Sequence, residues 1–403
     1  MWGGEFGAIG FVSLSDPETV IPIVTEPWDV ENFTESGSHR LWVVNERGRS
    51  TLRLAREGLE PETLETPKGV ISSLLLPPAR PAAAVLILEA ATRPAEIAVI
   101  DLKTGDLRYL TDSRPPGLLK IAPVEPQVVN YPSENGRRID ALLYRPPGDG
   151  PFPVAMMVHG GPHGQERPDY TRSGLYQFLT TRRIALFSPQ MSGSSSYGTS
   201  FQRSIYRDWG GIDLEDFAAA LCYLQSTDWA DPRRVAVAGG SYGGFAALSC
   251  LSRLDHPWAA GVSLYGPANL VTFARNCPPT WRSFVDTVLG NPDRDADFLR
   301  ERSPITYADQ ITSPLFVIQG AMDPRVPQNE ADQIVTEVRA SGTPVRYDIY
   351  PDEGHGFTRR DNEIQAYTDL SSFLIDHLTA AKSAQPTTSR RSPVSLFHPR
   401  VTS

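Results

Sequence analysis

A serine flanked by glycines stands between an apolar strand and a helix in the second half of the chain. The segment Gly239-Gly240-Ser241-Tyr242-Gly243 follows the apolar run 234–238, and a helix is expected to begin near Phe245. In a strand–turn–helix context this turn is too tight for large flanking side chains, and it exposes the serine hydroxyl above the sheet, where a base can reach it. The pattern therefore predicts that Ser241 is a nucleophile.

A serine hydroxyl is a weak nucleophile, so it needs a histidine base that is itself oriented by an acid. In this strand–turn–helix class the chain order is serine, acid, histidine. Three of the seven histidines follow Ser241 at a useful distance. His377 falls inside the last expected helix and His398 in the terminal tail, which leaves His355 in a glycine-flanked loop after a strand.

The acid should follow the strand before the one that leads to His355. The apolar segment 315–318 runs directly into Asp323, which we predict to be the acid, and Asp352 is the weaker candidate. A tetrahedral intermediate also needs hydrogen-bond donors for its oxyanion. We expect one from the backbone N–H of Tyr242 and another from the glycine-rich segment 159–162, in which His159 itself is expected to play a structural role.

These residues require a framework of strands and helices, and the sequence from Gln127 to about Ala381 has that pattern. Short apolar segments alternate with amphipathic stretches, as a mostly parallel α/β sheet demands. One such stretch places Leu214, Phe217, Ala218, Leu221 and Leu224 at helical spacing, with Asp213 as the expected N-cap. The expected strands are 154–158, 184–188, 234–238, 259–264, 315–318 and 345–350.

The first part of the chain has a different pattern, with short β-segments at 41–44, 50–55, 84–88 and 96–102. Residues 41–44 align with 86–88, and 51–54 with 96–99, at an offset of about 45 residues, which is the length of a four-stranded propeller blade. A stretch of 124 residues holds only about 2.7 such blades, too few to close a ring. We therefore expect a truncated β-propeller-like segment whose open edges favour self-association, or else a plain antiparallel sheet with a chance repeat.

We divide the chain into a β-propeller-like segment over 1–124, a catalytic domain over 125–381 and a disordered tail over 382–403. The tail is rich in Ser, Thr and Pro and carries four basic residues but no acidic one. The fold class expected for the whole is α/β, with a mostly parallel sheet covered by helices on both faces and preceded by a truncated all-β segment.

Composition limits the partners and the compartment. The 38 basic and 47 acidic residues give a net charge of −9, which argues against nucleic-acid or anionic-membrane binding. No apolar run approaches the roughly 18 residues of a membrane helix, and no secretory signal is visible, so a cytoplasmic location is expected. Three cysteines without CxxC spacing indicate neither a disulfide framework nor a zinc site, and no metal or organic cofactor is expected.

Five segments together resemble the prolyl oligopeptidase family of serine peptidases, in the style of its acylaminoacyl-peptidase and dipeptidyl-peptidase-like members. They are HGGPH at 159–163, WGGIDLEDFAAALCYL at 209–224, DPRRVAVAGGSYGGF at 231–245, GAMDPRVP at 320–327 and DEGHGF at 352–357.

The resemblance implies an α/β-hydrolase fold with a triad of Ser241, Asp323 and His355. It also implies an oxyanion hole made by the amides of Gly161 and Tyr242. Arg325 matches the family's arginine that binds a substrate carbonyl, and Val326 matches a pocket wall. The family lines its acyl pocket from a segment that here holds four aromatic residues, for which ordinary core packing is the alternative: Tyr265, Phe273, Trp281 and Phe284.

One departure concerns the substrate. The family has an Asn-Tyr-Arg-Gly-Ser stretch after its second core strand, but residues 190–194 here are Gln-Met-Ser-Gly-Ser, without the arginine. We expect a serine peptidase or amidase that acts on short or N-blocked peptides through an acyl-Ser241 intermediate. The alternative is a carboxylesterase, or a hydrolase or acyltransferase of a small metabolite, with the same triad. A non-catalytic scaffold is disfavoured because all three triad members are present.

Overall fold

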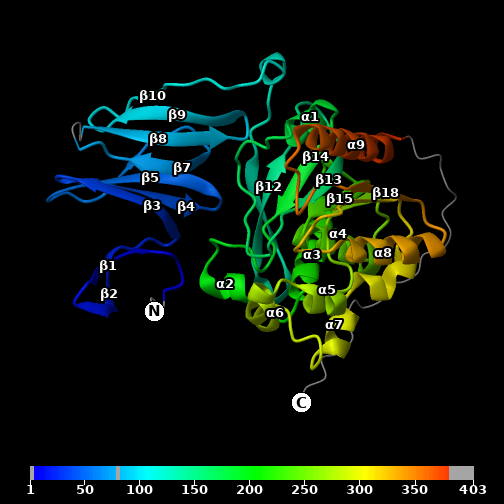
Figure 1. The fold of residues 1–403 in the computed structure, drawn as a ribbon. Coiled ribbons are helices and arrows are strands. Elements are labelled where there is room, and N and C mark those ends of the chain that lie inside the picture. Colours follow the sequence, from blue (N-terminus) through cyan, green and yellow to red (C-terminus); the bar gives the residue numbers. More distant parts are fainter. Residues whose placement is uncertain (1–3, 79–81, 381–403) are drawn as a thin grey trace.

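The computed structural model describes residues 4–78 and 82–380, and within these ranges the strands form four sheets (Figure 1). Two small four-stranded sheets lie beside the β11 and β12 edge of a large eight-stranded sheet. The expected fold class, an α/β-hydrolase domain preceded by a propeller-like segment of small sheets, is confirmed. The tail predicted over 382–403 lies outside the described residues.

The small sheets are antiparallel meanders, as alternating short strands with tight turns require. Sheet order is β3-β4-β5-β6 in one and β10-β9-β8-β7 in the other, and β1 and β2 form a separate hairpin. The strands are β1 (Ile9–Ser13), β2 (Asp16–Val24), β3 (Asp29–Ser36), β4 (His39–Glu46), β5 (Arg49–Arg56), β6 (Glu62–Leu64), β7 (Val70–Leu75), β8 (Ala83–Ala90), β9 (Arg93–Asp101) and β10 (Leu107–Tyr109). The predicted domain boundary after residue 124 stays a prediction.

The two four-stranded sheets share one hydrophobic core. The side chains that face this core show where the expected 45-residue repeat holds and where it does not. The offset of 45 residues holds between β4 and β8, because Leu41 and Leu86 both point into the core. It is one residue too long between β5 and β9: Leu54 pairs with Leu41 and Ala98 pairs with Leu86, so these two positions correspond at an offset of 44 residues. The second repeat is thus one residue shorter at its β8–β9 hairpin, where the register is irregular between Leu88 and Ala90, and this changes which side chains face inward.

The large sheet has the order β11-β12-β14-β13-β15-β16-β17-β18. Its first two strands are antiparallel to their neighbours, and the remaining pairings are parallel. The sequence did not indicate β11 or β12, whereas the six expected strands are all present. The strands are β11 (Gln127–Pro132), β12 (Arg138–Tyr144), β13 (Phe152–Val158), β14 (Ala185–Pro189), β15 (Ala230–Gly240), β16 (Ala260–Leu264), β17 (Leu315–Gly320) and β18 (Val345–Tyr350).

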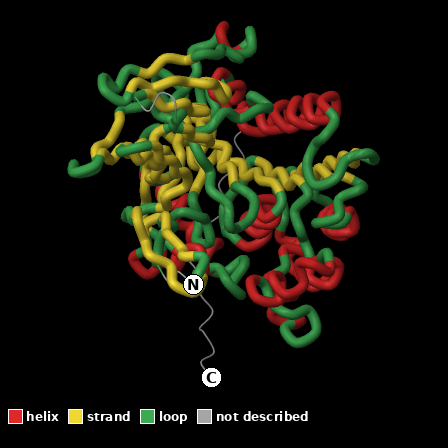
Figure 2. The backbone as a smooth tube through the Cα atoms, turned by 60° about the vertical axis from the view of Figure 1, so that its left-hand side comes forward, coloured by secondary structure: helices red, strands yellow, loops and turns green. Residues whose placement is uncertain are grey.

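Helices cover both faces of this sheet, so its central strands are apolar on both sides. Along β13, Val154 and Met156 face one hydrophobic core and Ala155 and Met157 face the other. Figure 2 shows strands between helices above and below. α1 and α9 pack on one face of the sheet, and α3 and α4 pack on the other. The helices are α1 (Leu175–Thr181), α2 (Thr199–Arg203), α3 (Ile212–Ser226), α4 (Tyr242–Arg253), α5 (Leu270–Asn276), α6 (Arg282–Val288), α7 (Ala296–Arg302), α8 (Gln328–Ala340) and α9 (Arg360–Thr379). Four short 3-10 helices are η1 (Leu118–Lys120), η2 (Glu134–Gly136), η3 (Pro279–Trp281) and η4 (Pro304–Gln310).

Two helix starts differ from the prediction. Asp213 is not the N-cap of α3, because the helix begins at Ile212 and the Asp208 side chain accepts the hydrogen bond of the Ile212 amide. Asp213 instead lies buried in the first turn. α4 begins at Tyr242 rather than near Phe245, so Ser241 itself occupies the N-cap position.

No helix within 4–78 and 82–380 is both long and apolar enough to cross a bilayer.

Candidate active site

Ser241 stands on the sharp turn between β15 and α4. Its backbone has φ 58 and ψ −123, a strained conformation for a residue with a side chain, and this aims the hydroxyl away from the sheet. The turn closes only because Gly243 lacks a side chain, since a Cβ there would lie 2.1 Å from the carbonyl oxygen of Val158. The local sequence thus dictates the exposed hydroxyl.

Ser241, His355 and Asp323 meet in one hydrogen-bonded series. The distance from His355 Nε2 to Ser241 Oγ is 2.9 Å, and His355 Nδ1 lies 2.6 Å from Asp323 Oδ2. The three loops follow β15, β17 and β18, which are parallel, so their carboxyl ends meet at the same edge of the sheet. The structure brings these three predicted residues together.

The carboxylate of Asp323 is fully buried and oriented by the chain that follows it. Its Oδ1 accepts hydrogen bonds from the amides of Arg325 at 2.8 Å and Val326 at 3.0 Å, which leaves Oδ2 for His355. The alternative acid Asp352 has a side chain that is 42% exposed and forms an ion pair with Arg359. The geometry favours Asp323 over Asp352.

A buried glutamate that the sequence analysis missed fixes the loop of His355. Glu353 accepts hydrogen bonds from the amides of Thr358 and Arg359 and from the side chain of Asn362, so it closes the loop around the histidine. Burial alone would raise the pKa of Glu353, but these hydrogen bonds outweigh it and lower the pKa to about 2. The Asp-Glu-Gly-His spacing was the available signal, because it placed a second carboxylate two residues before the histidine.

The segment 159–162 lies against the serine turn. A Cβ built on Gly160 would lie 3.5 Å from the Cβ of Ser241, and Gly161 lines the same cavity as Ser241, Tyr242 and His355. His159 has the expected structural position, with Nδ1 2.8 Å from the carbonyl oxygen of Gly160. Burial lowers the pKa of His159 to about 4, so this ring is neutral near pH 7.

A cavity of about 180 Å³ opens beside the Ser241 hydroxyl. Of the predicted binding residues, Arg325 and Val326 line it, and the Arg325 guanidinium lies 5.6 Å from the centre of the Trp281 ring. Tyr265 does not line it; its ring packs against the imidazole of His355 at 4.7 Å. The other cavity walls are mostly apolar: Trp209, Pro267, Phe273, Trp281, Phe284, Val285, Val288 and Leu289.

Metal-ligating side chains are not gathered in the described part of the chain. There, no group of three or more His, Cys, Asp or Glu residues is arranged to hold a metal ion.

Comparison with known proteins adds a family and a fold. The model of the prolyl oligopeptidase family matches residues 171–381, more than half of the chain. Dipeptidyl aminopeptidase BIII of Pseudoxanthomonas mexicana is 36% identical over 293 residues, which cover 69% of this chain and 42% of that protein. Dipeptidyl peptidase family member 6 of Caenorhabditis elegans is 34% identical over 230 residues, 56% of this chain and 31% of that protein. The chain thus spans less than half the length of these two relatives.

Among solved structures, that of a puromycin hydrolase superimposes with a TM-score of 0.82 at 24% sequence identity. The superposition covers 95% of this chain and 60% of that one, so the small sheets as well as the large sheet have counterparts there. This similarity shows that the two chains share a fold.

Proposed function

Because this chain belongs to the prolyl oligopeptidase family, we propose that it is a serine peptidase that hydrolyses amide bonds of short or N-blocked peptides. The observation that carries the proposal is the series Ser241–His355–Asp323 at the mouth of an apolar cavity. A serine, a histidine and a buried carboxylate in this order are the groups that acyl transfer requires.

In the proposed first half-reaction, Ser241 Oγ attacks the carbonyl carbon of the scissile amide and its proton passes to His355 Nε2. The buried Asp323 carboxylate accepts the hydrogen bond of Nδ1–H and stabilises the imidazolium. The amides of Gly161 and Tyr242 donate to the oxyanion. His355 then protonates the amine, the C–N bond breaks, and the acyl group stays on Ser241 as an ester.

In the second half-reaction, water attacks the ester carbon and gives its proton to His355. The C–O bond to Ser241 breaks, the serine recovers its proton from His355, and the carboxylic acid product leaves. Atoms and charges balance without a cofactor.

The cavity supports an apolar side chain on the acyl side of the scissile bond. Its volume of about 180 Å³ is similar to that of an apolar cavity of roughly 150 Å³ that binds benzene in another protein. An aromatic or large aliphatic side chain therefore fits. We propose that Arg325, at the edge of this cavity, donates to a substrate carbonyl oxygen.

Ser192 favours one alternative, the carboxylesterase. It stands at the place of the family's missing arginine and is fully buried, so it brings no charge to the substrate. An enzyme that binds peptides less firmly here would still cleave activated esters with the same triad.

The test compares wild type and Ser241→Ala on a p-nitrophenyl ester, a free aminoacyl or dipeptidyl p-nitroanilide and an N-acetylated aminoacyl p-nitroanilide. Cleavage of an anilide at a rate near that of the ester supports a peptidase, and ester cleavage alone supports the alternative. Ser241→Ala should leave only the roughly 10³–10⁴-fold catalysis over water that persists without a triad. The control is Ser226→Ala, which removes an exposed hydroxyl at the end of α3. Full activity in Ser241→Ala would contradict both functions.

Composition adds two predictions: a cytoplasmic location and substrates that are small peptides rather than nucleic acids.

A further inference from the structure

Two buried carboxylates in the first turns of α3 have no part in the proposed chemistry. Asp213 is 1% exposed and Asp216 is fully buried. They stand three residues apart on one helix, so they lie on neighbouring positions of its surface. Buried carboxylates are costly unless they are well hydrogen-bonded, so their partners show what they hold in place.

Asp213 holds Tyr242, the residue whose amide is one proposed oxyanion donor. The Tyr242 hydroxyl donates a hydrogen bond to Asp213 Oδ2, and the Gly210 amide donates to the same oxygen at 3.1 Å. Trp209, next to Gly210, packs edge-on against the Tyr242 ring at 4.9 Å and lines the cavity. One carboxylate thus connects the oxyanion residue to the cavity wall.

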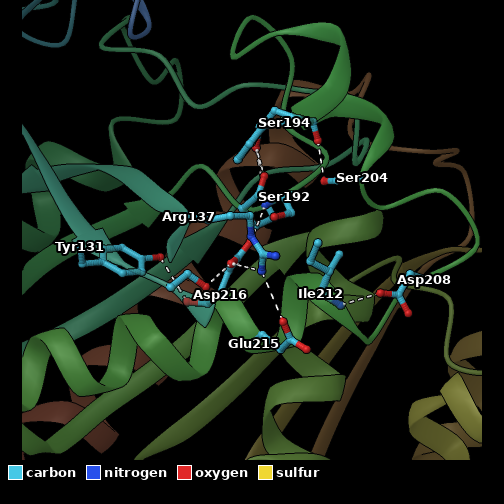
Figure 3. A network of polar contacts seen from close by, with 12 residues as sticks. Tyr131, Arg137, Ser192, Ser194, Ser204, Asp208, Ile212, Glu215 and Asp216 are labelled. Carbon is cyan, nitrogen blue, oxygen red and sulfur yellow. Dashed lines mark hydrogen bonds and ion pairs between the residues drawn. The ribbon is translucent and has the colours of Figure 1, made fainter. Parts of the chain in front are cut away.

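Asp216 holds the loop that follows β14. Its Oδ2 accepts a hydrogen bond of 2.7 Å from the Ser192 amide, and Arg137 donates to its Oδ1 at 3.2 Å (Figure 3). The Ser133 hydroxyl donates to the same Oδ1. The carboxylate is therefore paired on both oxygens, and the loop over 190–195 is tied to α3.

The 190–195 loop in turn holds the segment that contains Gly161. Ser194 Oγ lies 2.9 Å from His159 Nε2, and the Ser195 amide donates to the carbonyl oxygen of Gly164 at 2.7 Å. Gly161 lies between these two contacts in the chain. The loop that lacks the family's arginine therefore uses small hydroxyl and amide groups to fix the second proposed donor.

We propose that Asp213 and Asp216 position the two halves of the oxyanion hole, Asp213 through the Tyr242 side chain and Asp216 through the 190–195 loop and His159. The inference rests on the proposed function, because it presupposes an oxyanion at the amides of Gly161 and Tyr242. Both are positioning residues, since neither touches the substrate. Donors stabilise an oxyanion only at a defined place, and a displacement near 1 Å costs up to about 100-fold in rate.

The first test is a double-mutant cycle of Asp213→Asn and Tyr242→Phe, measured on the best substrate of the wild type. Each change should lower kcat by about 10- to 100-fold with KM within about twofold, and the double variant should lose little more than either single one. Tyr242→Phe keeps the backbone amide and the buried ring, so it tests the contact if Asp213→Asn does not fold. Asp208→Asn is the control, because Asp208 caps the same helix without contacting Tyr242.

The second arm compares Asp216→Asn and Ser194→Ala with the control Ser204→Ala, whose hydroxyl donates only within its own turn. The same fall in kcat is expected for both, and none for the control. Ser194→Ala removes a single hydroxyl, so it carries this arm if Asp216→Asn leaves Arg137 unpaired and the chain does not fold.

The Ki of a peptide aldehyde inhibitor gives a second measurement, and a loss of folded protein does not change this Ki. Ser241 Oγ adds to its carbonyl carbon while the serine proton passes to His355, which leaves a hemiacetal oxyanion at the two amides. The aldehyde Ki should rise by the same factor as kcat falls. The inference is wrong if kcat and Ki stay within about twofold of wild type in every one of these variants that folds: Asp213→Asn, Tyr242→Phe, Asp216→Asn and Ser194→Ala. If the proposed function itself is wrong, Ser241 of the wild type should not react with a fluorophosphonate. This result distinguishes failure of the proposed function from failure of the inference.

Discussion

Arg47, at the tip of the β4–β5 hairpin, donates two hydrogen bonds of 2.7 Å to the carboxylate of Asp140 on β12. This bidentate pair crosses from a small sheet to the large one. Asp140 is only 12% exposed, so the pair is shielded more than an ordinary surface ion pair.

Arg47→Met should therefore lower the free energy of unfolding by about 1–3 kcal/mol, because it leaves Asp140 without its charged partner. Urea unfolding would measure the loss. The matched control is Arg40→Met, whose ion pair with Glu35 is more than half exposed on both sides and should matter by less than about 1 kcal/mol. Equal effects of the two substitutions would contradict this reading of the contact.

A second prediction concerns the pH dependence of stability. Burial raises the pKa of Asp213 from 3.8 to about 6, although the Tyr242 hydroxyl opposes the shift. Between these two values the folded chain binds more protons than the unfolded chain, so this group's contribution to stability is largest at low pH and falls as pH rises to about 6. The stability of wild type relative to Asp213→Asn should fall over this range and be constant above it. If the difference in stability between wild type and Asp213→Asn stays constant from about pH 4 to about pH 7, the raised pKa of Asp213 is contradicted.

Glu353 provides a third prediction, because it closes the loop that presents His355. Glu353→Gln loses one acceptor for the amides of Thr358 and Arg359 and should lower kcat by about tenfold. The rate of Ser241 labelling by a fluorophosphonate should fall by a similar factor. Asp352→Asn, at the exposed neighbouring position, should leave both rates near wild type. An unchanged labelling rate in Glu353→Gln would show that the loop holds its place without this carboxylate.

The cavity gives a fourth prediction. Val288→Phe places a ring in the apolar space beside Ser241 and should reduce kcat/KM for substrates with a large acyl-side residue by about 10- to 100-fold relative to alanine substrates. Thr287→Phe, at the neighbouring exposed position of α6, is the control. If the ratio of the two substrates is unchanged, the acyl side chain does not enter this cavity.

The β1–β2 hairpin gives a fifth prediction. Phe11 and Ile21 pair across it and are both 55% exposed, together with other apolar side chains of the two strands. Such a surface favours association, so we expect the chain to form oligomers at micromolar concentration. Phe11→Ser with Ile21→Ser should shift light-scattering masses toward the monomer. If the wild-type chain is monomeric at all micromolar concentrations tested, this prediction is wrong.

The central strands were predictable because burial on both faces makes them continuous apolar runs, as at 154–158 and 234–238. β11 and β12 were missed because both mix polar with apolar residues, and β11 is the edge strand of the sheet. The series Ser241–His355–Asp323 could be anticipated because each member follows a recognisable strand. The contact of Asp213 with Tyr242 could not be anticipated, because the two residues are 29 positions apart and only the folded chain brings them together. Tyr265 was assigned to the pocket, but its backbone has φ 41 and its ring packs against His355 instead.

The proposed triad depends on strands that join the sheet late in the sequence. Ser241 and His355 are 114 residues apart, and Asp323 precedes His355 by 32. During synthesis on the ribosome, Ser241 therefore emerges well before His355, its proposed base. If His355 is the base as proposed, Ser241 stays an unactivated alcohol until β18 is added to the sheet, and a nascent chain that ends before this strand should not attack peptides.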